Sequence, residues 1–244
     1  MEFFVLEIIT NTATFRNPEF QNFHKTLPLP PPTTIMGMAG AAMGLSPKSA
    51  QDFFDNNSFK YGVFGKSVGK AKDTWKYRKL LKGPELYNYR PEYGSVITKE
   101  ILFGNSLFIV FGSDNTNAVE KLISSFENPR YALTMGNSDS LAFIKSIKKI
   151  EQLTKSKTIR NCIVEGNVVD EVLSNPNKDL EFSIYQTAEP IAYDLPVRFN
   201  YESDYGKRTV SEIKTFSFVT AEMVLNFNIE GISYNDFFIP ICDL

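Results

Sequence analysis

Apolar residues recur with short polar interruptions at the start and in the middle of the chain, and both stretches predict β-strands. Residues 2–10 (EFFVLEIIT) are almost wholly apolar, and residues 100–113 (EILFGNSLFIVFGS) repeat the pattern with aromatic and β-branched side chains. Residues 115–127 change to a helical period, with Asn115 or Thr116 near the start. The apolar face of this helix consists of Val119, Leu122, Ile123 and Phe126.

A proline-rich lead-in precedes another predicted helix. Residues 24–45 read HKTLPLPPPTTIMGMAGAAMGL, and the prolines favour a stiff, polyproline-like approach. Thr33 or Thr34 is a suitable N-cap for a helix over residues 35–45, and residues 47–56 predict a short helix after it.

The remaining pattern completes an α+β fold class. Residues 59–64 predict a short strand, residues 131–136 and 141–150 predict strand-like pieces around a turn, and the C-terminal part, 151–244, is β-rich. The order strand, helix, strand, strand, helix, strand matches the ferredoxin-like (RRM/RAMP-type) βαββαβ unit. We therefore expect one RAMP domain over 1–244, with a ferredoxin-like core in 1–150.

Residues 65–98 interrupt this core with a basic, aromatic segment. It contains Gly83-Pro84, Pro91 and Gly94, which favour turns. We expect an inserted thumb, either a projecting hairpin or a long loop.

Composition excludes several classes of protein. Of the 244 residues, 43% are hydrophobic and 22% charged, which is typical of a globular chain. Cys162, Cys242 and the single histidine, His24, are too few and too scattered for a zinc site, and we expect no cofactor or metal. The cysteines favour a reducing, cytoplasmic setting. Residues 35–45 form the longest weakly polar run, too short to cross a membrane.

The charge is balanced overall and uneven locally. The net charge is −2, but residues 60–90 carry nine Lys or Arg against two acids, and residues 145–160 carry six against one. Residues 165–204 carry two against nine. Such polarisation favours a basic stripe that binds nucleic acid, although solvated charge runs would give the same count.

Two glycine patterns lack the spacing of nucleotide-binding motifs. Before GVFGKS (62–67), Lys60 stands where a Walker A motif requires glycine, and Ala39 breaks the dinucleotide fingerprint in the glycine-rich helix. Gly37, Gly40 and Gly44 still need a reason, since glycine costs about 1 kcal/mol in a helix. They allow either close packing or approach of an anionic backbone to the helix start.

The sequence TWKYRKLLK (74–82) carries the clearest chemical signal. On a strand, Trp75, Tyr77 and Lys79 share one side and Lys76 and Arg78 the other. Aromatic rings between cations are how proteins hold single-stranded nucleic acid. An ordinary hairpin with a solvated lysine face would look the same.

The segment ATFRNPEFQNFHKTLPLPPPTTIMGMAGAAMGL (13–45) resembles the N-terminal signature of Cas family number five, a RAMP-superfamily group of CRISPR-associated proteins. In addition, residues 131–144 (YALTMGNSDSLAFI) resemble the family's strand followed by G-x-S, with Asn137 where many members carry Arg. The matching residues of the signature are Phe15, Arg16, Pro18, Thr26, Pro28, Pro31, Pro32, Thr33, Thr34, Ile35, Gly37, Gly44 and Leu45.

The resemblance implies a non-catalytic subunit of a type I Cascade complex, closest to type I-B. Such a subunit binds the 5′ handle of the CRISPR RNA, caps the filament of backbone subunits and lies beside the large, PAM-reading subunit, so that it meets target DNA only indirectly. The combined arguments predict RNA contacts from Arg16, His24, Lys25, Thr26, Thr33, Thr34, Ile35, Met36, Gly37, Lys66, Trp75, Lys76, Tyr77, Arg78, Lys79, Arg130, Asn137 and Ser138.

Two other functions remain open. A type I-C relative cuts precursor RNA without metal, using a Tyr/Lys/His group, and His24 is the only histidine available for such an activity. The chain could also be a generic RNA-binding ferredoxin-like module outside CRISPR systems.

Overall fold

The computed structural model describes residues 1–20, 23–78, 94–150, 152–174 and 191–244. The predicted RNA-binding residue Lys79 and the tip of the predicted thumb lie outside them.

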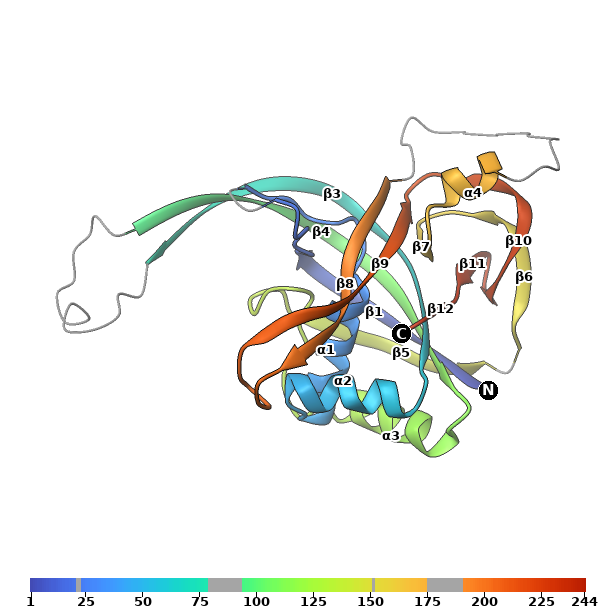
Figure 1. Cartoon of the computed structure of the whole chain (residues 1–244), viewed down its shortest axis with the longest axis horizontal. Helices are drawn as coiled ribbons and strands as arrows, with labels where there is room; N and C mark the ends of the chain where they lie inside the picture. Colours follow the sequence, from blue (N-terminus) through green and yellow to red (C-terminus); the bar gives the residue numbers. More distant parts are fainter. Residues whose placement is uncertain (21–22, 79–93, 151, 175–190) are drawn as a thin grey trace.

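The centre of the molecule is an antiparallel sheet with helices on one face (Figure 1). Its strands lie in the order β5-β1-β4-β3, and the chain order agrees with the predicted order of strands and helices. The fold is therefore mixed α/β and rich in strands. The elements are β1 (Glu2–Ala13), α1 (Pro32–Met43), α2 (Pro47–Asn56), β3 (Lys60–Arg78), β4 (Gly94–Ser113), α3 (Thr116–Glu127) and β5 (Ala142–Ile150).

Alternation along β1 supplies a core on both faces of the sheet. Phe4 and Leu6 pack with the helices, whereas Phe3 and Val5 pack on the opposite face against C-terminal strands. This is the side-chain period of a strand buried on both sides. The predicted apolar face of α3 is buried in the first of these clusters, as expected.

Helix α1 begins earlier than predicted. Its N-cap is Pro31, with no side-chain hydrogen bond, and Pro32 occupies the first helical position. The prediction that Thr33 or Thr34 caps the helix is wrong, because proline at this position already supplies a helical φ and needs no donor partner. The helix ends at Gly44, whose φ of 72° is left-handed.

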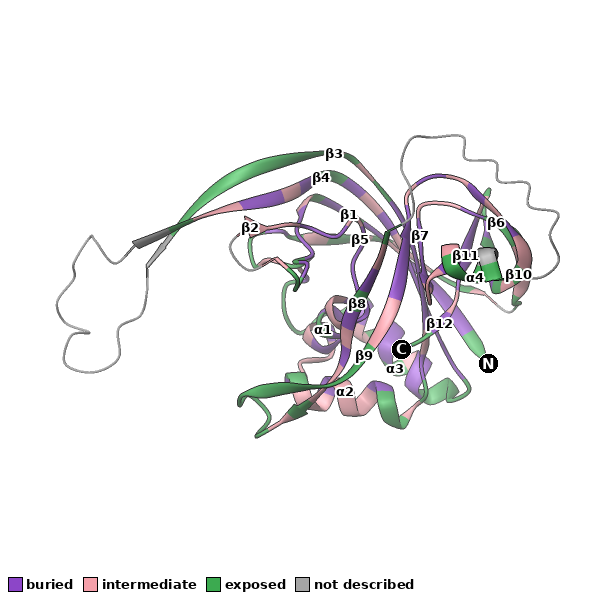
Figure 2. Ribbon diagram, turned by 45° about the horizontal axis from the view of Figure 1, so that its top comes forward, coloured by how far each residue is buried: buried purple, intermediate pink, exposed green. Residues whose placement is uncertain are grey.

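Strands β3 and β4 extend far beyond the sheet as a two-stranded ribbon. Their pairing runs from Lys60↔Gly112 to Arg78↔Gly94, and the ribbon arches away from the body (Figures 1 and 2). The predicted strand end at residue 64 is thus wrong: the basic segment continues the core strands. Beyond Leu102, the last residue of β4 that pairs with β1, the β3–β4 pair continues without β1.

The C-terminal part extends the first sheet and adds a second. Strands β7 (Cys162–Glu165), β9 (Arg208–Val219) and β8 (Ile191–Tyr201) continue beyond β3, and β2 (Phe23–His24) and β12 (Cys242–Asp243) pair with β4 and β3. The second sheet has the order β11-β10-β6, and a short helix, α4, precedes β8. The bounds of these last elements are Phe237–Pro240 (β11), Met223–Tyr234 (β10), Thr154–Ile159 (β6) and Val168–Ser174 (α4).

The second sheet covers the face of the first that the helices leave free. Phe237 stacks on Phe64 with ring centroids 4.0 Å apart, and Ile239 is fully buried in the same cluster. On the helix face, Phe216 and Phe218 of β9 belong to the cluster of Phe4. Residues before and after residue 150 thus belong to the same hydrophobic clusters.

The predicted strand at residues 131–136 is wrong. This segment forms only an isolated bridge, Thr134↔Leu141. Gly136 has a φ of 94°, and a Cβ there would lie 1.7 Å from the carbonyl oxygen of Thr14, so the chain turns tightly against the end of β1 where no side chain fits.

The two glycines of α1 predict opposite responses to alanine. A Cβ at Gly40 would lie 2.7 Å from the Cβ of Ala50, whereas one at Gly37 would meet nothing within 4 Å. Gly37→Ala should therefore raise the free energy of unfolding by up to about 1 kcal/mol through helix propensity. Gly40→Ala should be less stable than Gly37→Ala by about 1–3 kcal/mol because it overpacks α1 against α2. Urea unfolding measures both, and equal stabilities would contradict this account of α1.

Candidate nucleic-acid interface

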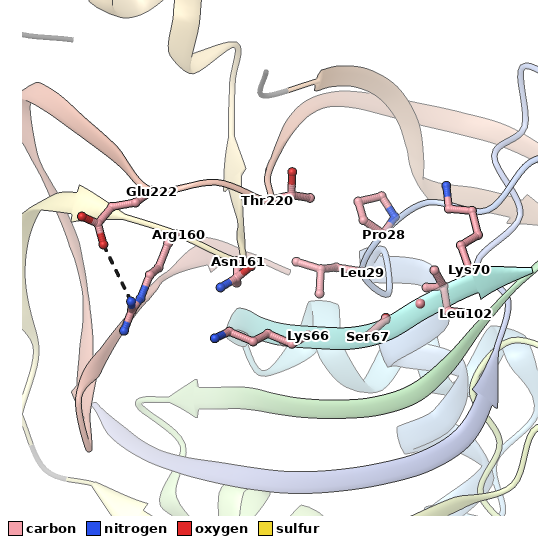
Figure 3. A pocket seen from close by; sticks show the side chains of 12 residues that line it. Pro28, Leu29, Lys66, Ser67, Lys70, Leu102, Arg160, Asn161, Thr220 and Glu222 are labelled. Carbon is pink, nitrogen blue, oxygen red and sulfur yellow. Dashed lines mark ion pairs between the residues drawn. The ribbon is translucent and has the colours of Figure 1, made fainter. Parts of the chain in front are cut away.

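A groove of about 640 Å³ lies where the ribbon leaves the body, and we call it the root groove (Figure 3). One wall is β3, and the facing wall comes from the β6–β7 and β9–β10 turns. The groove is lined by Pro28, Leu29, Gly65, Lys66, Ser67, Gly69, Lys70, Leu102, Arg160, Asn161, Thr220 and Glu222.

Backbone geometry ties the two walls together. Asn161 adopts a left-handed conformation (φ 47°), and its carbonyl accepts a hydrogen bond of 2.9 Å from the amide of Gly65. The neighbouring residues Phe64 and Cys162 pair as well, and they join β3 to β7 directly after the turn. The turn that carries Arg160 is thereby held against β3.

The charges of the root groove favour an anion. The Lys66 side chain is exposed and forms no ion pair with any described residue. Lys70 pairs with Glu100 at 3.4 Å, and Arg160 pairs loosely with Glu222 at 3.7 Å. Three cations thus line the groove with one carboxylate, Glu222, and the unpaired amine of Lys66 is available to a phosphate.

The lead-in from Arg16 to Leu29 is a strap along the base of the ribbon. Arg16 and Thr26 form an antiparallel bridge, and β2 pairs with β4 through His24↔Lys99. The Thr26 hydroxyl accepts a 2.8 Å hydrogen bond from the amide of Phe15 and is buried. The Thr26 hydroxyl is thus already used within the protein, which conflicts with its predicted contact to RNA. Lys25 is half-buried beside the Phe20 ring and retains a charge at the surface.

His24 and Trp75 meet at Lys99, a residue that the sequence arguments missed. The Lys99 amine lies 3.8 Å from the centre of the Trp75 ring, and the indole N–H donates to Asp73 at 3.0 Å. Burial lowers the pKa of Lys99. Burial also lowers the pKa of His24, and the nearby charges of Arg16 and Lys99 lower it further.

Other predicted thumb residues lie on the ribbon itself. Lys76 is exposed and pairs with Val96, on the face opposite Trp75. Tyr77 and Arg78 complete β3. The structure thus brings these positions onto one projecting strand.

The start of α1 is a poorer anion site than predicted. Helices leave their first four amides without partners, but here two of these positions are Pro31 and Pro32, which have no N–H. The amides of Thr34 and Ile35 both donate to the Pro31 carbonyl, at 3.0 and 3.2 Å. Ile35 and Met36 have buried side chains, so a contact of Ile35 with RNA would have to come from its backbone, and Met36 lines a pocket beside α1. Thr33 remains half-buried and Gly37 exposed.

The three remaining predicted residues do not line the root groove. Arg130 packs beside Gly44, and its amide donates to the Ala42 carbonyl at 2.8 Å. Asn137 and Ser138 lie in the tight turn that follows Gly136, where the Asn137 carbonyl accepts from the Ser140 amide. Both are at the surface.

The root groove contains residues that sequence reasoning did not select. Lys70 and Arg160 belong to the two basic segments, but Ser67, Asn161 and Thr220 carry no sequence signal. They come together through long-range pairing, namely the Gly65–Asn161 hydrogen bond and the neighbouring order β3-β7-β9 in the sheet.

Three features of the described residues concern metal ligands, membrane-spanning helices and cysteines. They contain no group of three or more His, Cys, Asp or Glu placed to hold a metal. None of the described helices has the length and apolar character needed to cross a bilayer. Cys162 and Cys242 are free and buried, and burial raises the pKa of both thiols.

One protein family matches most of the chain. The profile of the family described as CRISPR-associated protein (Cas_Cas5) matches residues 3–221. A solved structure described as "CRISPR RNA-guided surveillance complex" aligns over 92% of this chain and 91% of its own, with 13% identity and a TM-score of 0.53. A CRISPR protein from Archaeoglobus fulgidus aligns over 99% and 100%, with 12% identity and a TM-score of 0.47. No curated protein matches the chain.

Because His24 is the only histidine, its titration can be followed by proton NMR without assignment. We expect a midpoint below the usual value of about 6.5, and Arg16→Gln should raise it. Lys25→Gln is the matched control, since Lys25 is a neighbouring cation with no such effect on the His24 pKa. The folded pKa lies below the unfolded one, so His24 stabilises the fold above the unfolded pKa and loses this contribution as the pH falls. A midpoint at or above the usual value would contradict the placement of His24.

Proposed function

Since the chain belongs to the Cas5 family of CRISPR-associated proteins, we propose that it is a non-catalytic subunit of a type I Cascade complex that binds the 5′ handle of the CRISPR RNA. The root groove is the observation that carries this proposal. The groove is open to solvent and is lined by the unpaired amine of Lys66, by the hydroxyl groups of Ser67 and Thr220 and by the side-chain amide of Asn161. Such groups can bind the phosphates and riboses of a single strand.

Different residues of the groove would contact different parts of the RNA. Lys66 and Lys70 on β3 supply the phosphate contacts, and Arg160 approaches from the facing turn. Ser67 and Asn161 offer hydrogen bonds to ribose and base edges. Phosphate contacts fix the register of the strand, whereas base identity is read by edges and stacking.

We assign the β1-to-β5 unit to the ferredoxin-like fold, because the sheet order β5-β1-β4-β3 with intervening helices is the arrangement of a split βαβ pair. The projecting part of β3 and β4 is then the thumb. Its exposed lysines and Trp75, which lie farther along β3 than the root groove, are suited to hold or kink the RNA where the handle meets the spacer.

We also retain the predicted partners as part of this proposal. The backbone subunit and the large, PAM-reading subunit would contact this chain within a type I-B-like complex. The exposed β8–β9 hairpin, with Tyr205, Val210 and Ile213 at the surface, offers apolar area for one of them.

A metal-independent ribonuclease is the second candidate. The lowered pKa of His24 keeps its imidazole neutral, as a general base requires, and Lys99 pairs with it across β2 and β4. We favour the binding function because the root groove offers several phosphate contacts away from this pair.

The groove makes a quantitative prediction for RNA affinity. Lys66→Gln combined with Lys70→Gln should weaken binding of CRISPR repeat RNA and lower the slope of log affinity against log salt by about 0.7 for each phosphate that the protein no longer neutralises. Filter binding at several salt concentrations measures both. The matched control, Lys121→Gln with Lys155→Gln, removes two exposed charges elsewhere and should leave the slope unchanged. Equal effects of both pairs would show that only total charge matters.

The ribonuclease alternative has a direct test. Purified protein incubated with CRISPR repeat RNA in EDTA should leave the RNA intact. Site-specific cleavage that disappears in His24→Ala, but persists in Lys25→Ala, would overturn the non-catalytic assignment.

A further inference from the structure

Gly37 has no structural reason to be glycine. Gly40 is required by the contact with Ala50, and Gly44 by its left-handed backbone. Gly37 has neither constraint: its φ is not positive, and a Cβ there would meet nothing within 4 Å. Glycine inside a helix still destabilises it. The space in front of Gly37 is therefore kept open at a cost to the helix.

That space belongs to a pocket of about 270 Å³ between α1 and the β8–β9 hairpin, and we call it the α1 pocket. Three aromatic rings line it, Tyr131 from the segment after α3 and Phe199 and Tyr201 from β8. Arg208, at the start of β9, completes the wall.

The walls of the α1 pocket are held in place. The side-chain amide of Gln51 on α2 donates to the Phe199 carbonyl at 3.1 Å and accepts from the Phe199 amide at 2.9 Å. Arg198 forms an ion pair with Asp55, also on α2. The hairpin is thus fastened to α2 at Arg198 and Phe199, so the pocket is formed before any ligand arrives.

The lining selects a flat, electron-rich or anionic ligand. The Arg208 guanidinium lies 4.4 Å from the centre of the Phe199 ring, and it forms no ion pair with any described residue. Aromatic faces with a stacked arginine are surfaces on which unstacked bases of single-stranded RNA pack. The half-buried Thr33 hydroxyl adds a hydrogen-bonding group.

We propose that the α1 pocket takes one unstacked nucleobase of single-stranded RNA, with its phosphate near Arg208. This inference rests on the proposed function in assuming that the chain binds RNA. The volume lies below the about 300–1,000 Å³ of small-molecule sites, so it suits a single base rather than a run of bases.

Binding of a fluorescent adenylate decamer, measured by anisotropy, tests the proposal. Gly37→Leu fills the pocket, and Tyr131→Ala removes a ring that is 58% exposed and so dispensable for folding. Each should weaken binding about 5- to 150-fold, the range for one stacked base. Their salt slope should stay that of the unmodified protein, because no phosphate contact is removed. Val210→Ala, exposed on the same hairpin, is the matched control and should bind normally.

The outcomes separate the two proposals. If the unmodified protein binds no RNA, both are overturned. If the Lys66/Lys70 variant loses affinity while Gly37→Leu and Tyr131→Ala bind normally, the α1-pocket proposal alone is wrong. Pocket variants that bind RNA normally but lose co-purifying proteins would assign the pocket to a protein side chain instead, again overturning it. The melting temperature shows whether a variant is folded. Gly37→Leu should have a melting temperature equal to or above that of the unmodified protein. A lower melting temperature together with weaker RNA binding would indicate that Gly37 has a packing role and would overturn the proposal.

Discussion

The uninterrupted pairing of β3 with β4 determines where the other functional elements lie. Its first half is anchored on both faces, since Tyr61 and Val63 pack with the helices and Phe64 packs with the second sheet. Its second half has no such cover and projects from the body (Figure 2). A two-stranded ribbon alone is marginal in water, so its direction and stability come from the buried half. The root groove lies at the junction between the two halves, where a rigid sheet meets an exposed, cationic extension.

The proline lead-in contributes to the two candidate sites by fixing where neighbouring elements lie, and less by binding RNA with its own polar groups. Two prolines at the start of α1 remove the donors that would have made the helix tip an anion site, yet they fix the direction in which the helix leaves the strap. Pro28 and Leu29 of the same lead-in form part of the root groove's wall. One segment thus positions both the α1 pocket and the root groove while its own polar groups, such as Thr26, stay engaged within the protein.

Local patterns allowed much of the fold to be predicted, and long-range contacts explain what was missed. The apolar period of α3 and the start of β1 depend on neighbouring residues, so both were predicted well. The length of β3 was not, because Lys66 to Lys76 resembles a solvated loop in composition, and only pairing with β4 makes it a strand. Predicted ribbon residues such as Trp75 were placed on one element, but Lys99, Asn161 and Thr220 reach their positions through partners far away in sequence. The burial of the Ile35 and Met36 side chains was not predicted, because a family motif does not say which side of a helix faces the core.

Two carboxylates pair with cations of the root groove, Glu222 within its lining and Glu100 beside it, and they differ in how easily a phosphate could replace them. An exposed pair such as Arg160 with Glu222, 3.7 Å apart, contributes little to stability, so a phosphate can replace the carboxylate at small cost. Glu100 differs, because it is buried and also accepts a hydrogen bond from the Thr26 amide. It would therefore keep its contact with the strap, and the Lys70 amine, which has three N–H donors, can contact Glu100 and a phosphate at the same time. The exchangeable acid lies on the C-terminal wall and the fixed acid on the ribbon side, so RNA entry would alter contacts of the facing turn and leave the β3–β4 base as it is.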